Sequence, residues 1–89
     1  MTLPKEITVT IPAQKYDFDK YTSPTNCYIA EAIRKLYPNK QINVTSFGIT
    51  EINDIIYRPI GHFDSDILIE AFSQNKDVTL TLTNSKNPL

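Results

Sequence analysis

The strongest constraint on the fold is a strict two-residue alternation of apolar and polar side chains near both ends of the chain. In residues 5–11 the apolar positions are Ile7, Val9 and Ile11, and in residues 77–83 they are Val78, Leu80 and Leu82. This period predicts two strands, each with one buried face. The matched apolar faces suggest that these strands lie side by side, in a parallel arrangement. The intervening threonines, Thr8, Thr10, Thr79, Thr81 and Thr83, are then expected on the sheet face opposite the helices.

A helix is expected soon after the first strand. Ser23 is a typical N-cap residue, and Pro24 suits the first helical position. The helix is predicted to run to about Tyr37, because Pro38 disfavours helical geometry in the residue before it. Its apolar stripe comprises Ile29, Ala30, Ile33, Leu36 and Tyr37.

The middle of the chain predicts a three-part meander and a second helix. The meander is expected to comprise a strand over 41–47, a bend at Gly48 and an extended segment over 49–52. A two-residue turn at Asn53 and Asp54 then leads to a strand over 55–60, with Pro59 near its edge or end. A loop over 61–63 is followed by a helix to about Asn75, capped by Asp64 or Ser65. The order β-α-β-β-β-α-β indicates an α+β fold. We expect a single-layer mixed or antiparallel sheet of about four to five strands, with both helices on one face.

The chain has 89 residues, which is enough for one domain, with 84–89 as a flexible tail. A net charge of −1 argues against a protein that binds duplex nucleic acid through a basic field. No export signal and no apolar run long enough to span a bilayer is present, so we expect a cytoplasmic protein.

Few side chains in this sequence could carry chemistry. One cysteine excludes an internal disulfide, and one histidine leaves little for a zinc site or a catalytic triad. Two Asp-x-Asp pairs, at Asp17 with Asp19 and Asp64 with Asp66, lack the further oxygen ligands and glycine turn of a metal loop. We therefore expect no enzymatic activity, no cofactor and no metal.

The segment from Pro12 to Ser23 fits neither helix nor strand and is long for a connection in a small domain. It contains Tyr16, Phe18 and Tyr21 among Lys15 and Lys20. Exposed aromatic rings between charged side chains are typical of recognition loops. The same rings could instead fold back as a lid over the sheet or the first helix.

The start of the first helix is a second candidate site. Its predicted first turn contains Ser23, Thr25 and Asn26 and no acid, so free N–H groups could hold a phosphate, with Lys15, Lys20 and the nearby rings to hold a base. A plain N-cap accounts for the same residues. Cys27 would lie in that first turn, where the helix dipole lowers a thiol pKa, or would be a small buried residue.

The helix start also carries a resemblance. A Pro-x-x-Cys segment that runs into an Ala-x-x-basic pattern, Pro24 to Cys27 and then Ala32 to Lys35, followed by a meander and a helix–strand close, resembles small accessory proteins of tailed bacteriophages. The resemblance implies a protein made in the host cytoplasm that binds a host factor or a signalling molecule of host defence. No functional residues come with it.

These observations predict a non-enzymatic phage-type protein that neutralises a host component, such as an anti-phage defence protein, by stoichiometric binding. Arg58, Tyr57, His62 and Phe63 are expected to extend the binding surface from the meander. One alternative is sequestration of a nucleotide-type signal at the first helix, and another is a virion or assembly component. A homo-oligomer could form through a sheet edge or the threonine-rich face.

Overall fold

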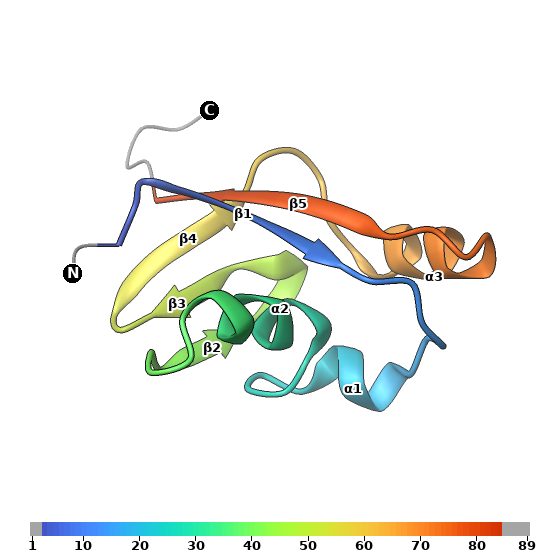
Figure 1. Ribbon diagram of the computed structural model, residues 1–89, viewed down its shortest axis with the longest axis horizontal. Coiled ribbons are helices and arrows are strands. Elements are labelled where there is room, and N and C mark those ends of the chain that lie inside the picture. The colour runs from blue at the N-terminus through green and yellow to red at the C-terminus, as the bar shows by residue number, and fades with distance from the viewer. Residues whose placement is uncertain (1–2, 85–89) are drawn as a thin grey trace.

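A computed structural model describes residues 3–84, apart from the side chain of Ser46. The elements in chain order are β1 (Glu6–Ile11), α1 (Phe18–Thr22), α2 (Tyr28–Leu36), β2 (Ile42–Val44), the 3-10 turn η1 (Ser46–Gly48), β3 (Thr50–Ile52), β4 (Ile55–Pro59), α3 (Ser65–Ser73) and β5 (Val78–Thr83). They form one five-stranded sheet with helices packed on it, which confirms the predicted α+β class (Figure 1).

Every pair of neighbouring strands is antiparallel, in the spatial order β1-β5-β4-β3-β2. The terminal strands are neighbours, as predicted, with Ile7 opposite Leu82 and Val9 opposite Leu80. Their predicted parallel direction is wrong. Alternation with a period of two has no direction, so matched apolar faces specify which strands can pair but not which way they run.

The sheet is curled, and α2 contacts both of its edge strands, β1 and β2. The amphipathic pattern explains this position, because one side of α2 buries Ile29, Ala30 and Ile33. Across from them lie Tyr57 and Leu82, which are both fully buried. Each such side chain contributes about 1.5–3 kcal/mol through removal from water. The core therefore lies between α2 and the concave side of the sheet.

Two turns of the meander use left-handed backbone. Asn53 and Asp54 have φ values of 48° and 71°, which confirms the predicted two-residue turn between β3 and β4. Phe47 and Gly48 have φ values of 58° and 79°. They reverse the chain, so that β3 returns antiparallel to β2. The predicted strand over 41–47 is therefore too long, since the strand ends at Val44.

The first long helix begins later than predicted, with Cys27 rather than Ser23 as its N-cap. The Ser23 hydroxyl accepts a hydrogen bond from the Asn26 N–H, which closes a separate turn. The Pro24 carbonyl accepts from the Val44 N–H at 2.7 Å, so this carbonyl is held by β2 and not by a helical turn. A contact between distant segments thus overrides a local start signal.

The remaining boundaries are close to the predictions. Asp64 is the N-cap of α3, and its carboxylate accepts from the N–H groups of Asp66 and Ile67. The helix ends at Ser73 instead of near Asn75, which adopts a left-handed φ of 56°. Asn84 bonds to the Lys5 carbonyl, and the rest of the predicted flexible tail lies outside the described residues. No helix within 3–84 is long and apolar enough to cross a membrane.

Candidate functional site

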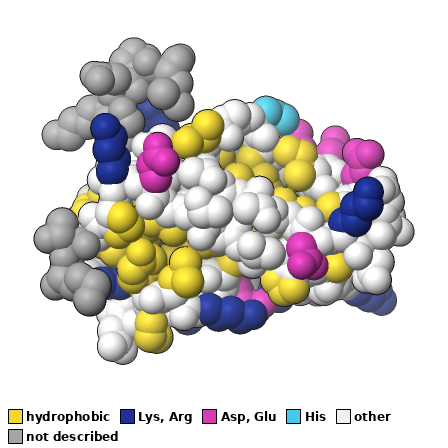
Figure 2. Space-filling model, turned by 45° about the horizontal axis from the view of Figure 1, so that its top comes forward, with side chains coloured by type: hydrophobic (Ala, Val, Ile, Leu, Met, Phe, Trp, Pro, Cys, Tyr) yellow, Lys and Arg dark blue, Asp and Glu magenta, His cyan; other side chains and the backbone are white. Residues whose placement is uncertain are grey.

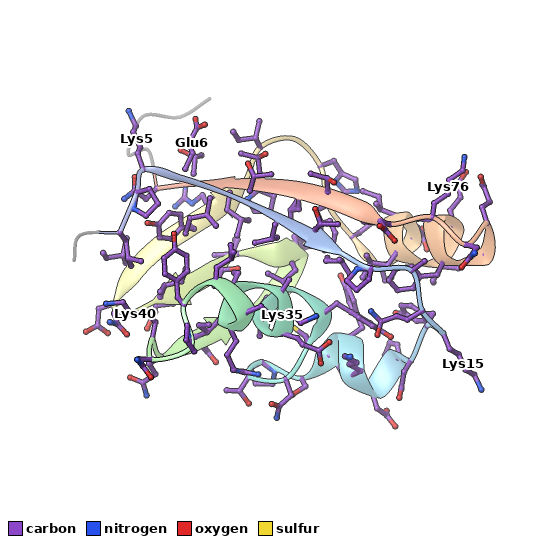
Figure 3. All side chains as sticks on the ribbon, viewed as in Figure 1. Lys5, Glu6, Lys15, Lys35, Lys40 and Lys76 are labelled. Carbon is purple, nitrogen blue, oxygen red and sulfur yellow. The ribbon has the colours of Figure 1, made fainter. Side chains whose placement is uncertain are left out.

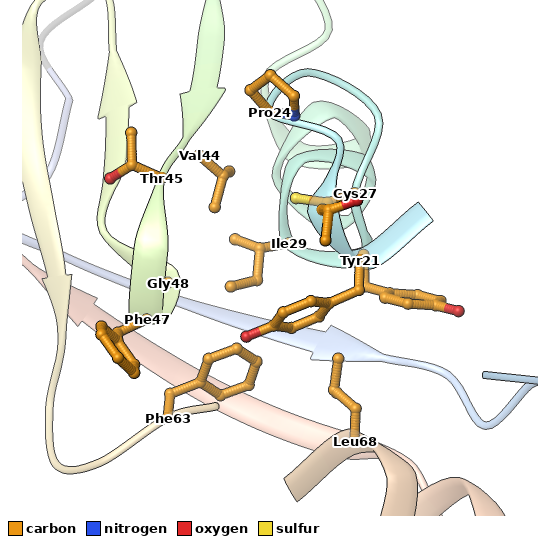
Figure 4. A pocket seen from close by; sticks show the side chains of 12 residues that line it. Tyr21, Pro24, Cys27, Ile29, Val44, Thr45, Phe47, Gly48, Phe63 and Leu68 are labelled. Carbon is orange, nitrogen blue, oxygen red and sulfur yellow. The ribbon is translucent and has the colours of Figure 1, made fainter. Parts of the chain in front are cut away.

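An apolar cleft of about 400 Å³ opens where the start of α2 faces the β2–β3 turn (Figure 4). Its walls come from four places: α1 with the turn after it, the first turn of α2, the β2–β3 connection, and the segment around α3. The lining residues are Tyr21, Thr22, Pro24, Cys27, Tyr28, Ile29, Val44, Thr45, Phe47, Gly48, Phe63 and Leu68. This volume falls within the range of sites that bind small molecules or a protruding side chain.

Among the side-chain hydroxyls that line the cleft, that of Tyr21 has no hydrogen-bond partner inside the described part of the chain. The three other hydroxyls of the lining donate hydrogen bonds: Thr22 to the Asp19 carbonyl, Thr45 to the Ile49 carbonyl and Tyr28 to the Lys15 carbonyl. Burial raises the pKa of Tyr21, so the phenol stays protonated and can donate a hydrogen bond. A mostly apolar lining with a single free hydroxyl suits an apolar ligand that carries one acceptor.

Cys27 lies in the wall as a structural group. Its sulfur accepts a hydrogen bond from the Ala30 N–H at 3.5 Å, so it caps α2. Burial raises the pKa of the thiol, against the lowering effect of the helix N–H groups. The predicted small buried residue is therefore what the structure shows, with the side chain 3% exposed. A protonated, buried thiol is a poor nucleophile.

Phe47 is an exposed aromatic ring at the cleft, with 63% of its surface accessible. Its backbone is left-handed, with φ 58° and ψ 28°, which is uncommon for a bulky residue and costs about 1–3 kcal/mol. The next residue must be small, because a Cβ on Gly48 would come within 2.9 Å of the Pro59 side chain and 3.1 Å of Phe63. The chain thus exposes an aromatic ring at a turn position where a residue that tolerates left-handed backbone would avoid the strain.

The aromatic segment from Pro12 to Ser23 is divided between the two predicted arrangements. Tyr16 is half-buried and stacks on Tyr28, with 6.2 Å between ring centroids, and Tyr21 lies 6.1 Å from Tyr16. Tyr28 in turn meets Phe72 of α3 edge to face at 5.5 Å. Phe18 is 66% exposed. Tyr16 and Tyr21 therefore fold back as a lid, and Phe18 remains available for contact.

The predicted cations do not meet in the cleft. Lys20 pairs with Glu31 at 3.0 Å, donates to Gln14 at 3.2 Å, and lies 4.8 Å from the centre of the Tyr28 ring. Lys15 is exposed and its side chain points away from the body of the molecule (Figure 3). None of the residues that line the cleft is charged.

The first turn of α2 contains Glu31, so the prediction of a first turn without an acid is wrong. The error follows from placing the helix start four residues too early. Thr25 and Asn26 lie in the exposed turn before the helix, where the Thr25 carbonyl accepts from the Arg34 guanidinium.

The four residues predicted to extend the surface from the meander do not form one patch, and the prediction is wrong for Tyr57, which has no exposed surface. Arg58 is exposed on β4, on the opposite side of the strand from the buried Tyr57. His62 is exposed and bonds to the Asp64 carboxylate at 2.7 Å, which holds the pKa of Asp64 below its ordinary value. Phe63 is only 3% exposed and forms a wall of the cleft, so its predicted role as a surface contact is wrong.

Several site residues escaped prediction, above all Phe47 and Gly48, with Pro24, Val44 and Leu68. A Phe-Gly pair between two alternating segments was a usable signal for an exposed ring on a tight turn. Pro24 and Leu68 carried none, because long-range packing alone brings them to the cleft.

Within residues 3–84, no cluster of three or more histidine, cysteine, aspartate or glutamate side chains could hold a metal ion. Comparison of the chain with protein families, with curated proteins and with solved structures found no match.

Proposed function

We propose that this chain is a non-enzymatic binding protein that neutralises a host protein by stoichiometric binding, as its resemblance to phage accessory proteins suggests. The observation that supports this proposal most is the apolar cleft of about 400 Å³ with the exposed ring of Phe47 at its wall. An apolar pocket beside an exposed aromatic residue is the usual chemistry of a protein–protein hot spot.

The lining favours an apolar or aromatic side chain of the partner as the group that enters the cleft. Cys27, Ile29 and Phe63 offer apolar walls, and burial of a large side chain against them provides a driving force of about 25 cal/mol per Å². The Tyr21 hydroxyl can orient the entering group by donating one hydrogen bond. Phe18, on the adjacent α1, and Phe47 add exposed aromatic surface for the partner.

A nucleotide-type ligand is the second candidate, and less supports it. A phosphate in the cleft would meet no cation, since no lining residue is charged and the Lys20 ammonium is paired with Glu31. The α2 amide of Ala30 already bonds to the Cys27 sulfur. A thermal-shift panel of cyclic and adenine-based nucleotides tests this candidate, because a ligand of the folded state raises the melting temperature.

A matched pair of tryptophan substitutions tests the proposed function. Thr22 lines the cleft and is exposed, and its hydroxyl donates only to the carbonyl three residues before it. Ser73 is exposed in the last turn of α3 and makes the same kind of hydrogen bond, to the Glu70 carbonyl, away from the cleft. Thr22→Trp should therefore fill the cleft, while Ser73→Trp places an equal ring elsewhere.

The tagged wild type and both variants are used to capture partners from a bacterial lysate at equal concentrations of folded protein. We expect one host protein bound by the wild type and by Ser73→Trp and lost with Thr22→Trp. A partner that binds Thr22→Trp as well as the wild type would place the interface away from the cleft and contradict the proposal.

A further inference from the structure

The two edges of the sheet differ in how their backbone groups are used. The β2 edge is short, with three residues, and the segment before α2 covers part of it, because the Val44 N–H donates to the Pro24 carbonyl. The β1 edge has six residues. Within the described residues, β1 has no strand partner other than β5.

The antiparallel ladder fixes which β1 groups face this open edge. The Asn84 N–H donates to the Lys5 carbonyl, which makes residues 5 and 84 a hydrogen-bonded pair. Because such pairs alternate along antiparallel strands, Ile7, Val9 and Ile11 also direct their backbone groups to β5. The N–H and C=O groups of Glu6, Thr8 and Thr10 therefore point away from the sheet.

Natural sheets protect such an edge with lysine, proline, a bulge or a short strand. The six residues of β1 contain no lysine, proline or bulge, and their one charged side chain is Glu6 at the first position; the nearest prolines, Pro4 and Pro12, lie outside the strand at either end. Three donors and three acceptors in regular register form a template for one more strand.

We propose that β1 of a second copy of this chain occupies this edge, antiparallel to the first, with Thr8 opposite Thr8 across a two-fold axis. In this register Glu6 lies opposite Thr10 of the other copy, and all outward groups of both strands form hydrogen bonds. The two sheets then become one continuous sheet of ten strands, five from each copy. A two-fold axis lets one surface satisfy itself, so no other partner is required.

Charge selects this arrangement over a parallel one. Lys5 and Glu6 lie at the same end of β1 (Figure 3), so a parallel partner would place like charges next to each other. The antiparallel register separates them. It also brings Lys5 of each copy toward the end of the other β1, where the Asp77 carboxylate bonds to the Ala13 N–H.

The side chains beside the edge fit the same partner. On the exposed face, the hydroxyl of Thr8 lies 3.0 Å from that of Thr81, and that of Thr10 lies 3.5 Å from that of Thr79. Figure 2 shows this side of the molecule with a largely uncharged middle and most charged side chains toward its margins. A second copy would extend the threonine rows without burying a charge.

The test uses the self-opposed position. Analytical ultracentrifugation of the wild type should give about twice the chain mass of 10.2 kDa. Thr8→Lys and Thr8→Glu should each give the single-chain mass, because each places two like charges opposite one another. An equimolar mixture of the two variants should return to the double mass. Thr79→Lys, a threonine on the same face but one strand away from the edge, is the control and should keep the wild-type mass.

Circular dichroism checks that each variant folds, and amide hydrogen exchange of the wild type gives a readout that needs no variant. The Thr8 and Thr10 amides should exchange slowly at high concentration and rapidly on dilution. A wild type with the single-chain mass, a double mass unchanged by Thr8→Lys, or a mixture that fails to pair would each overturn the proposal. The two proposals fail separately. Thr22→Trp should lose partner capture and keep the double mass, because the cleft and the β1 edge are different surfaces.

Discussion

The two ends of α2 show opposite kinds of packing. In its second half, Ile33 has no exposed surface and lies over a core that includes Tyr57 and Leu82. At its start, Cys27 and Ile29 face the cleft. One helix thus anchors the curled sheet with one end and leaves space beside the other. The second half of the helix therefore contributes to stability, and its first turn to the binding that we propose, so substitutions should separate the two.

The largest effect is expected from Ile33→Ala. Truncation of this fully buried side chain removes apolar contacts and leaves a closed cavity, and should lower the free energy of unfolding by about 2–5 kcal/mol. Ile29→Ala, one turn earlier, is the matched variant, and its new space merges with the cleft. It should cost about 1 kcal/mol less, since part of its cavity term is already present. Urea titrations of both variants check this. Equal losses in the free energy of unfolding would contradict the difference in packing between the two ends of α2.

The next effect concerns the cleft wall at Gly48. Gly48→Ala places a methyl group in left-handed backbone and within 3.2 Å of Ile29, so the cost combines backbone strain and overpacking. Gly61→Ala has a similar φ of 84° with no atom within 4 Å, and serves as the control for strain alone. We expect Gly61→Ala to lose about 1–2 kcal/mol and Gly48→Ala about 1–3 kcal/mol more. Similar melting temperatures for the two variants would mean that the side chains around Gly48 shift to accept the methyl group at little cost in stability.

The starts of the two long helices should respond differently to pH. A hydrogen bond from His62 lowers the pKa of Asp64, the N-cap of α3, below its ordinary value of 3.8. A carboxyl whose folded pKa is depressed stabilises the protein above its unfolded pKa, and this stability is lost as the pH falls through the folded pKa. Asp64→Asn keeps a capping side chain but should flatten the acid limb of a plot of melting temperature against pH. Cys27→Ser, at the start of α2, should leave that limb unchanged. An unaltered acid limb in Asp64→Asn would assign the pH dependence to other carboxyls.

The smallest effect on stability is expected at Phe47, and it should have the opposite sign. Asparagine tolerates left-handed backbone, so Phe47→Asn should raise the free energy of unfolding by up to about 1 kcal/mol. Phe18→Asn removes a similarly exposed ring from α1 and should give no gain. Calorimetry measures both. If Phe47→Asn is more stable but captures less partner, the strained backbone is retained for binding. If Phe47→Asn is less stable, the Phe47 ring supports the fold.

Local patterns were sufficient for most of the fold. The alternation around Val9 and Leu80, and the turn at Asn53 and Asp54, depend on neighbouring residues alone, and both were predicted. The start of α2 was not, because the hydrogen bond from Val44 to the Pro24 carbonyl joins segments that are distant in the sequence.

The site was predicted less well for the same reason. Tyr21 was recognised from the aromatic pattern, but the cleft exists only because α1, the β2–β3 turn and Phe63 converge. The pairing of Lys20 with Glu31 likewise depends on how α1 lies against α2. Composition could indicate that rings were available, and only tertiary packing decides which of them face solvent.

The most direct test of the account is an NMR titration of the folded protein with N-acetyltryptophanamide, an uncharged mimic of an aromatic side chain. We expect saturable shifts confined to the amides of residues 21–29 and 44–48 in the wild type and in Ser73→Trp, and none in Thr22→Trp. Shifts that map to β1 and β5, or an unchanged spectrum up to the solubility limit of the probe, would contradict the claim that the cleft beside α2 binds an aromatic group.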